Sequence, residues 1–91
     1  MKEEIKDTEL YRSELQNRIL RELCKKWFRV AGTTEIAELD GDELAKEWDV
    51  PERIMWRVVQ EMFDEGLLEC DGVDIRLTRE GRKECKKRKF G

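Results

Sequence analysis

A turn of three residues, Asp49-Val50-Pro51, separates two short helices that the sequence predicts within residues 41–66. The residue before a proline avoids helical geometry, and proline is comfortable at the first position of a following helix. The first helix, about 41–48, begins after Asp40, which is followed three residues later by Glu in a capping pattern. The second helix covers residues 51–65 and ends before a glycine. The segment therefore predicts two helices joined by a tight turn.

A longer helix is predicted before this pair, over residues 8–31. Its apolar side chains recur every four residues along one face: Tyr11, Leu15, Ile19, Leu23 and Trp27. The early part of this face is a narrow stripe, and within one chain we expect only the short C-terminal helix and Phe90 to be able to cover it. A second copy covers it better, which predicts a homodimer held by residues 8–23 and 82–90. The alternative is a monomer whose first turns fray, because residues 1–9 form a polar tail.

A β-hairpin is expected over residues 67–78, because Asp71-Gly72 between apolar flanks is a strong signal for a two-residue turn. With that turn, the facing pairs that share one apolar side are Cys70 with Val73 and Leu68 with Ile75. Residues 33–39 allow a short strand as well. Thr78 caps a last short helix, which continues into a basic tail within residues 79–91.

The order of these elements resembles a winged helix-turn-helix domain over about residues 15–85. The resemblance is carried by ELAKEWDVPERIMWRVVQEMFDEGLLE and, after it, LTREGRKE. Trp48 and Asp49 stand where the family has leucine and glycine, and Leu77-Thr78-x-x-Gly81-Arg82 looks like the Leu-Thr-x-x-Gly-Arg of MarR-like regulators. The resemblance implies one domain, mainly α-helical, with a small β-hairpin wing. We expect its core to contain Trp27, Leu44, Trp48, Val59, Met62 and Leu67.

The resemblance also implies a function, because such domains place the start of the second helix in the DNA major groove. Arg53 and Arg57 would then bind guanine, and Gln60 would bind adenine, each through two hydrogen bonds. Trp56 would lie against a thymine methyl group or a sugar. Phosphate contacts are expected from Arg76, Arg79 and Lys83. The predicted function is therefore a sequence-specific, DNA-binding transcriptional regulator, with double-stranded DNA as its partner.

Charge favours a second interpretation. Residues 31–72 hold three basic and thirteen acidic residues, whereas residues 73–91 hold eight basic and three acidic ones. On this resemblance the second helix would be the recognition helix. The carboxylates on it and before it repel phosphates where no cation compensates their charge. An exposed Trp56 beside Ile54 suits the centre of a protein interface instead. The alternative function is thus a winged helix that binds a protein partner through this Trp/Ile surface, and RNA binding is a third reading.

No catalytic or cofactor site is expected. The chain has no histidine, no glycine loop that cradles phosphate, and three cysteines that are not spaced as zinc ligands. No apolar run approaches the roughly 20 residues that span a membrane, so a cytoplasmic protein with reduced thiols is expected. Cys24 and Cys85 lie on the first and last helices and would bridge only if their Cα atoms lay within about 7 Å. The charged fraction of 45% resembles that of proteins from hot environments.

Overall fold

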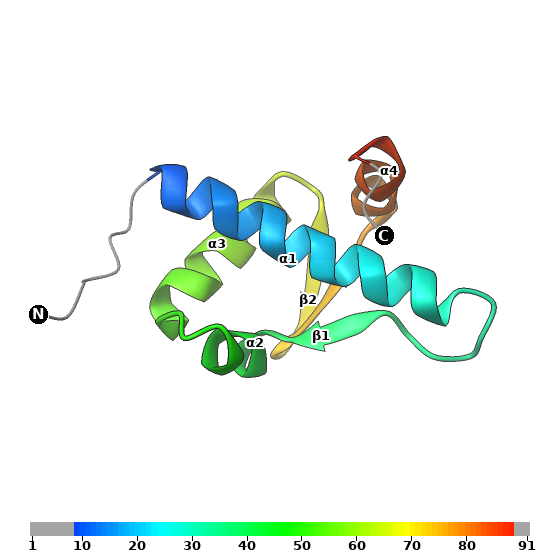
Figure 1. Cartoon of the computed structure of the whole chain (residues 1–91), viewed down its shortest axis with the longest axis horizontal. Coiled ribbons are helices and arrows are strands. Elements are labelled where there is room, and N and C mark those ends of the chain that lie inside the picture. Colours follow the sequence, from blue (N-terminus) through cyan, green and yellow to red (C-terminus); the bar gives the residue numbers. More distant parts are fainter. Residues whose placement is uncertain (1–8, 89–91) are drawn as a thin grey trace, which may run out of the picture.

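A computed structural model describes residues 9–88 as four helices and a three-stranded antiparallel sheet (Figure 1). The elements are α1 (Glu9–Val30), β1 (Glu38–Asp40), α2 (Gly41–Glu47), α3 (Glu52–Asp64), β2 (Leu68–Asp71), β3 (Asp74–Leu77) and α4 (Arg79–Arg88). The strand order is β1-β3-β2. The expectation of a mainly helical chain with a small β-hairpin is confirmed. Residues 1–8 of the polar tail and residues 89–91, with Phe90, lie outside the described part.

Helix α1 is the longest element, and its apolar face is buried along most of its length. Its buried residues are Leu15, Ile19, Leu20, Leu23, Cys24 and Val30. Helix α3 packs against its first half, where Arg12 Nε lies 3.0 Å from Glu61 Oε2 and Gln16 Nε2 donates to Glu61 Oε1 at 3.3 Å. The expectation that only the C-terminal helix and Phe90 can cover this half within one chain is wrong, because α3 packs there and Leu15 is only 4% exposed. The homodimer itself stays a prediction. Leu10, in the first turn of α1, is 70% exposed.

Helix α4 crosses α1 near Cys24 (Figure 1). Arg88 Nη1 donates to Asn17 Oδ1 at 2.6 Å, and Cys85 forms a disulfide with Cys24, with a Cα–Cα distance of 5.6 Å. The expectation of reduced thiols is therefore wrong for this pair, because the packing brings the two Cα atoms well inside bridging range. Cys70 is free and exposed, and partial burial raises the pKa of its thiol.

Local signals set the helix–turn–helix segment as expected. The Asp40 carboxylate accepts hydrogen bonds from the backbone N–H groups of Asp42 and Glu43, at 2.9 and 3.0 Å, so it caps α2. Asp49 has φ 54°, the left-handed conformation that Asp tolerates better than most residues. Pro51 is the N-cap residue of α3, whereas the sequence predicts it at the first helical position. The turn directs α3 across α2.

The hairpin has a different register from the one expected. Its turn is Gly72-Val73, and the facing pairs are Leu68 with Leu77, Glu69 with Arg76, Cys70 with Ile75 and Asp71 with Asp74. Gly72, with φ 66°, occupies the first central position, where a type II′ turn needs a glycine. In the observed register, Val73 lies at the exposed tip and Leu77 is buried opposite Leu68. These two leucines form a larger apolar pair than Cys70 with Val73. The short strand expected within 33–39 lies later, at β1, where it pairs with β3.

The stretch Leu77-Thr78-x-x-Gly81-Arg82 joins the hairpin to α4. The Thr78 hydroxyl accepts from the Gly81 N–H at 3.0 Å and so caps α4, as expected; it also donates to the carbonyl of Gly66. A Cβ on Gly81 would lie 2.2 Å from the carbonyl oxygen of Leu67, so no other residue fits without a shift of the backbone. These residues hold the start of α4 against the end of the α3–β2 connection.

The core agrees in part with the expected set. Three of the expected core residues are buried: Leu44, Val59 and Met62. The other three are larger or more peripheral, and they are only partly buried and pack against the core: Trp27, Trp48 and Leu67. The Arg18 guanidinium lies 4.1 Å from the centroid of the Trp48 ring, so one face of this indole is covered by a cation instead of by apolar side chains.

Removing the disulfide tests its contribution to stability. The bridge closes a loop across 61 positions of sequence, and chain entropy for a loop of that size corresponds to about 4 kcal/mol. We expect a reductant to lower the free energy of unfolding, measured by urea denaturation, by about 3–4 kcal/mol. A Cys24→Ala/Cys85→Ala variant should not respond to reductant, and Cys70→Ala should respond like the parent. The expectation is contradicted if the reductant leaves the stability of the parent unchanged although a thiol assay shows that all three cysteines are reduced.

Replacing Gly81 tests the α4 junction. Alanine is favoured over glycine within a helix by about 1 kcal/mol, but overpacking against a fixed backbone costs about 1–3 kcal/mol. We expect Gly81→Ala to lower the free energy of unfolding by about 1–2 kcal/mol in chemical denaturation. Glu80→Ala, on the exposed side of the same helix, is the control and should change stability little. A Gly81→Ala variant more stable than the parent would show that α4 does not press on residue 67.

Candidate nucleic-acid interface

The outer face of α3 carries three of the residues expected to read bases. Arg53, Arg57 and Gln60 are exposed and follow one another at spacings of four and three residues, which places them on one helical face. Gln60 Nε2 donates to Asp64 Oδ1 at 3.0 Å, so its amide is already oriented along the helix. The opposite face of α3 is fixed in the core by Ile54, Met55, Val58, Val59 and Met62. The structure brings these three polar residues together on a firmly packed element.

Trp56 belongs to the contact between α2 and α3. Its indole Nε1 donates to Asp42 Oδ1 at 2.7 Å, and a Cβ at Gly41 would come within 2.7 Å of two of its ring carbons. Ile54 is 1% exposed. The expectation of an exposed Trp/Ile surface is wrong, because the indole turns back onto the start of α2 and Ile54 faces the core. The sequence feature that permits this packing is Gly41, in the first turn of α2, because any side chain there would meet the ring.

Arg76 lies on the central strand, between two carboxylates. It faces Glu38 on β1 and Glu69 on β2 across the strands. Its Nη1 atom lies 3.8 Å from Glu38 Oε2, and its Nε atom lies 3.7 Å from Glu69 Oε1. Oppositely charged residues that face each other across strands attract, so the guanidinium is held within the sheet surface. The Nε atom is buried without a hydrogen-bond partner. The expected phosphate contact would therefore have to compete with two neighbouring carboxylates.

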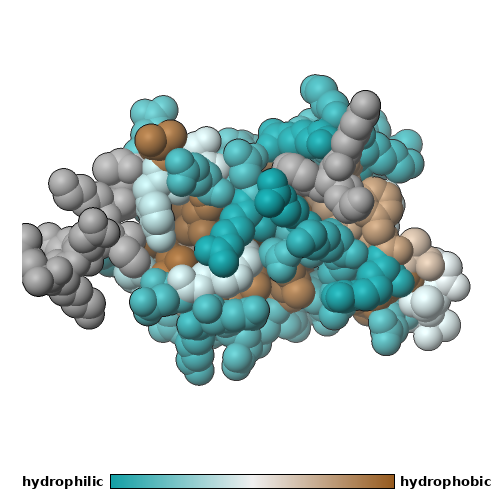
Figure 2. All heavy atoms as spheres, viewed as in Figure 1, coloured by the Kyte–Doolittle hydropathy of each residue, from teal (hydrophilic) through white to brown (hydrophobic). Residues whose placement is uncertain are grey.

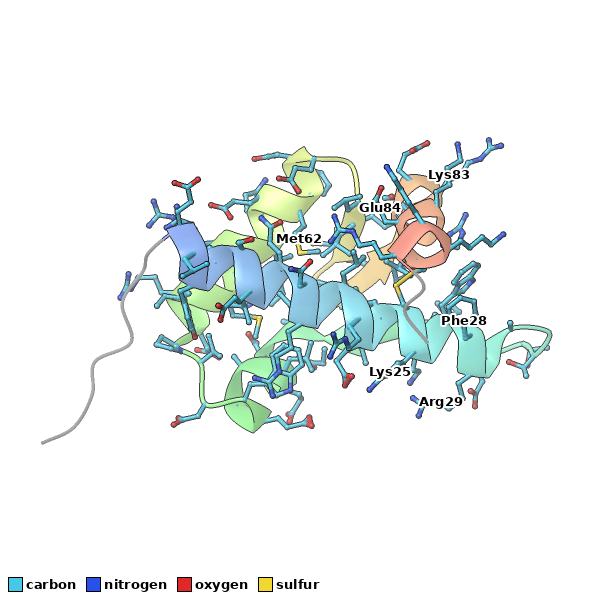
Figure 3. The ribbon with its side chains drawn as sticks, turned by 45° about the horizontal axis from the view of Figure 1, so that its top comes forward. Lys25, Phe28, Arg29, Met62, Lys83 and Glu84 are labelled. Atoms are coloured by element: carbon cyan, nitrogen blue, oxygen red, sulfur yellow. A yellow bond between two sulfur atoms is a disulfide. The ribbon has the colours of Figure 1, made fainter. Side chains whose placement is uncertain are left out.

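Arg79 and Lys83 lie on α4, beside the second half of α1. They line a hollow together with Trp27, Arg82 and Lys86. Figure 3 shows Lys83 on the outer side of α4, while Lys25 and Arg29 extend from the other side of α1. The sequence predicts phosphate contacts from Arg79 and Lys83, but it places Trp27 in the core.

The seven expected site residues thus separate into different regions. Three share the outer face of α3, two share the α4 hollow, Arg76 is held in the sheet and Trp56 packs inside the helix pair. The side chains around α3 are largely acidic, with exposed Asp64 and Glu65 at its end and Asp71 beside the hairpin turn. Figure 2 shows a mostly hydrophilic face over α1, with separate hydrophobic areas instead of one broad patch.

Within residues 9–88 no three histidine, cysteine or acidic side chains are grouped so that they could hold a metal ion. The helices of this part of the chain are too short or too polar to cross a membrane. Comparisons of the chain with protein families, with curated proteins and with solved structures found no match.

The bond between Trp56 and Asp42 can be measured by a double-mutant cycle. Trp56→Phe keeps a ring over Gly41 but removes the donor, and a hydrogen bond to a charged acceptor contributes about 1.5–3 kcal/mol when buried and less when partly exposed. We expect a coupling of about 1–2 kcal/mol between Trp56→Phe and Asp42→Ala in urea denaturation. A coupling near zero would mean that the indole is not anchored to α2.

Proposed function

We propose that the protein is a sequence-specific DNA-binding domain of the winged helix-turn-helix type, which acts in transcription regulation. The support is the order β1-β3-β2, in which a strand before the helix pair joins the hairpin that follows it. The left-handed turn at Asp49 and the capped α2 are further features of this arrangement. On this proposal, β2 and β3 form the wing, and α3 is the recognition helix.

The exposed row of Arg53, Arg57 and Gln60 is the observation that carries the proposal. Arginine pairs with the O6 and N7 atoms of guanine, and glutamine pairs with adenine, each through two hydrogen bonds. A recognition element must be rigid to place such groups, and α3 is fixed both by its buried face and by the bond from Trp56 to α2. Trp56 is therefore a positioning residue on this proposal and does not touch bases.

The acidic surroundings shape how DNA approaches. Asp64 and Glu65 at the end of α3, Asp49 and Glu52 at its start, and Asp71 at the hairpin turn all repel phosphates. Such repulsion lowers the affinity for every sequence alike. Binding then depends more on base contacts than it does in proteins whose wing carries lysine or arginine.

Two other readings have less support. A protein partner bound through Trp56 and Ile54 has little surface to bind, since Ile54 is buried and Trp56 is partly buried and bonded to α2. A homodimer over residues 8–23 is not part of the proposal, because α3 of the same chain covers Leu15. One chain per binding site is the simplest arrangement.

Selection of bound sequences from random duplexes, followed by fluorescence anisotropy on the selected site, tests the proposal. We expect Arg57→Ala to weaken binding by about 1–3 kcal/mol and to relax the preference at one base pair, because one bidentate contact is lost. Arg29→Ala removes the same charge from the end of α1 and is the matched control, with little effect expected. If no sequence is enriched, or if both variants weaken all duplexes equally, α3 does not read bases.

A further inference from the structure

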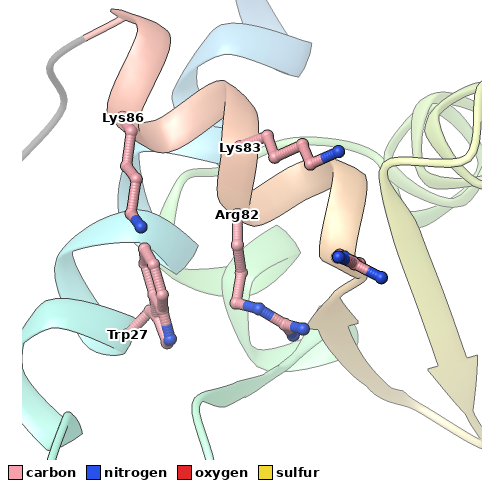
Figure 4. A pocket seen from close by; sticks show the side chains of 5 residues that line it. Trp27, Arg82, Lys83 and Lys86 are labelled. Carbon is pink, nitrogen blue, oxygen red and sulfur yellow. The ribbon is translucent and has the colours of Figure 1, made fainter.

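A hollow of about 270 Å³ lies between α4 and the second half of α1 (Figure 4). Four of its five lining side chains are cationic, and the fifth is an indole: Arg79, Arg82, Lys83, Lys86 and Trp27. No carboxylate is among these described lining residues. The Trp27 ring is partly buried against the core and tilts against the Phe28 ring, with 4.9 Å between centroids. The indole is therefore held in place with part of its surface open.

The cations are arranged around this ring. The Lys86 Nζ lies 5.9 Å from the Trp27 ring centroid, and Arg82 Nη1 donates to the Leu77 carbonyl at 3.4 Å. Lys83 pairs with Glu80 at 3.4 Å, an exposed carboxylate of the first turn of α4. Figure 4 shows Lys86 reaching over the indole, and Arg82 extending beside it. Like charges held this close repel one another, so an anionic ligand that lies among them is favoured.

The aromatic surface narrows the class of anion. A phosphate alone makes no use of an indole, whereas a nucleotide offers a flat ring to stack on it and a phosphate for the nearby cations. The volume is slightly below the roughly 300–1,000 Å³ of ordinary small-molecule pockets, which suits one ring and not a larger ligand. A duplex keeps its bases inside the stack and cannot place one there. A single strand can.

We propose that this hollow binds single-stranded nucleic acid, with one base stacked on Trp27 and the adjoining phosphates on Arg79, Lys83 and Lys86. The inference goes beyond the duplex-reading role of α3 and does not rest on it, because the two surfaces share no residue. The carboxylates near α3 make that side unfavourable for a flexible polyanion, which directs a single strand to α4.

The disulfide holds the two walls of the hollow together. Cys24 lies three residues before Trp27, and Cys85 lies next to Lys86. The bridge therefore fixes the cations of α4 relative to the indole of α1 before any ligand binds, which reduces the ordering cost of binding. Reduction is expected to weaken single-strand binding and to leave the residues of α3 in place.

Fluorescence anisotropy of a labelled oligo(dT) of about 12 nucleotides tests the proposal on the full, oxidised chain. Stacking on an aromatic side chain contributes about 1–3 kcal/mol per base. We expect Trp27→Leu, which keeps an apolar side chain, to weaken binding at least about fivefold, and Trp27→Phe to stay within about twofold of the parent. Lys86→Gln should also weaken binding. Lys46→Gln on α2 removes the same charge elsewhere and should have no effect.

Competition separates the other possible ligands. Inorganic polyphosphate should compete less well per charge than unlabelled oligo(dT), and oligoglutamate should compete less well still. Equal competition by polyphosphate would show attraction by charge alone, and equal competition by oligoglutamate would show an acidic-peptide surface; either overturns the proposal. So does parent-like binding by Trp27→Leu with an unchanged circular dichroism spectrum. Arg57→Ala should bind oligo(dT) like the parent, which keeps this test distinct from that of α3.

Discussion

The apolar stripe along α1 is the constraint on which the other elements depend. A helix of 22 residues is about 33 Å long, whereas α3 and α4, with 13 and 10 residues, are about 20 and 15 Å long. Neither is long enough to cover the stripe alone. Helix α3 packs against the first half, with Leu15, α4 packs near Cys24 through the disulfide, and strands β1 and β3 also contact α1. Within the described residues, the chain itself buries the stripe from Leu15 to Leu23.

This division separates opposite charges in space. The segments that accompany α3 are the acidic ones, and α4 carries the basic end of the sequence, so the two halves of α1 bear surfaces of different electrostatic character. A single ligand that needs both the α3 arginines and the α4 cations would have to pass acidic side chains. Two separate surfaces, one for base edges of a duplex and one for a flexible strand, agree better with this distribution than one continuous basic face.

Features set by neighbouring residues could be predicted from the sequence. The cap at Asp40, the left-handed turn at Asp49 and the cap at Thr78 each depend on a few adjacent positions, and the structure has all three. The sequence predicts the hairpin turn one residue too early, because burial of Leu77 decides the register, and that burial depends on what packs against the sheet. Local pattern cannot supply such information.

The candidate site was less predictable for the same reason. The expected phosphate contacts included Arg76, but a residue on a central strand meets whatever its two neighbours present, here two carboxylates. The role of Trp56 depended on the crossing of α2 and α3, which brings Gly41 beneath its ring. The spacing of Trp27 fits the apolar stripe and predicts a core residue, although α4 leaves part of its ring open among cations.

The indole N–H signals of the three tryptophans offer the most direct measurement of two separate surfaces. Trp27 lies in the α4 hollow, Trp48 lies beneath Arg18, and Trp56 is bonded to Asp42 beside the α3 face. In ¹⁵N-correlated NMR spectra, we expect oligo(dT) to shift the Trp27 signal most, and a selected duplex to shift Trp56 and the backbone of α3. Trp48 should move little with either. If both ligands shift the same signals, or if neither moves Trp27, the two-surface account is contradicted.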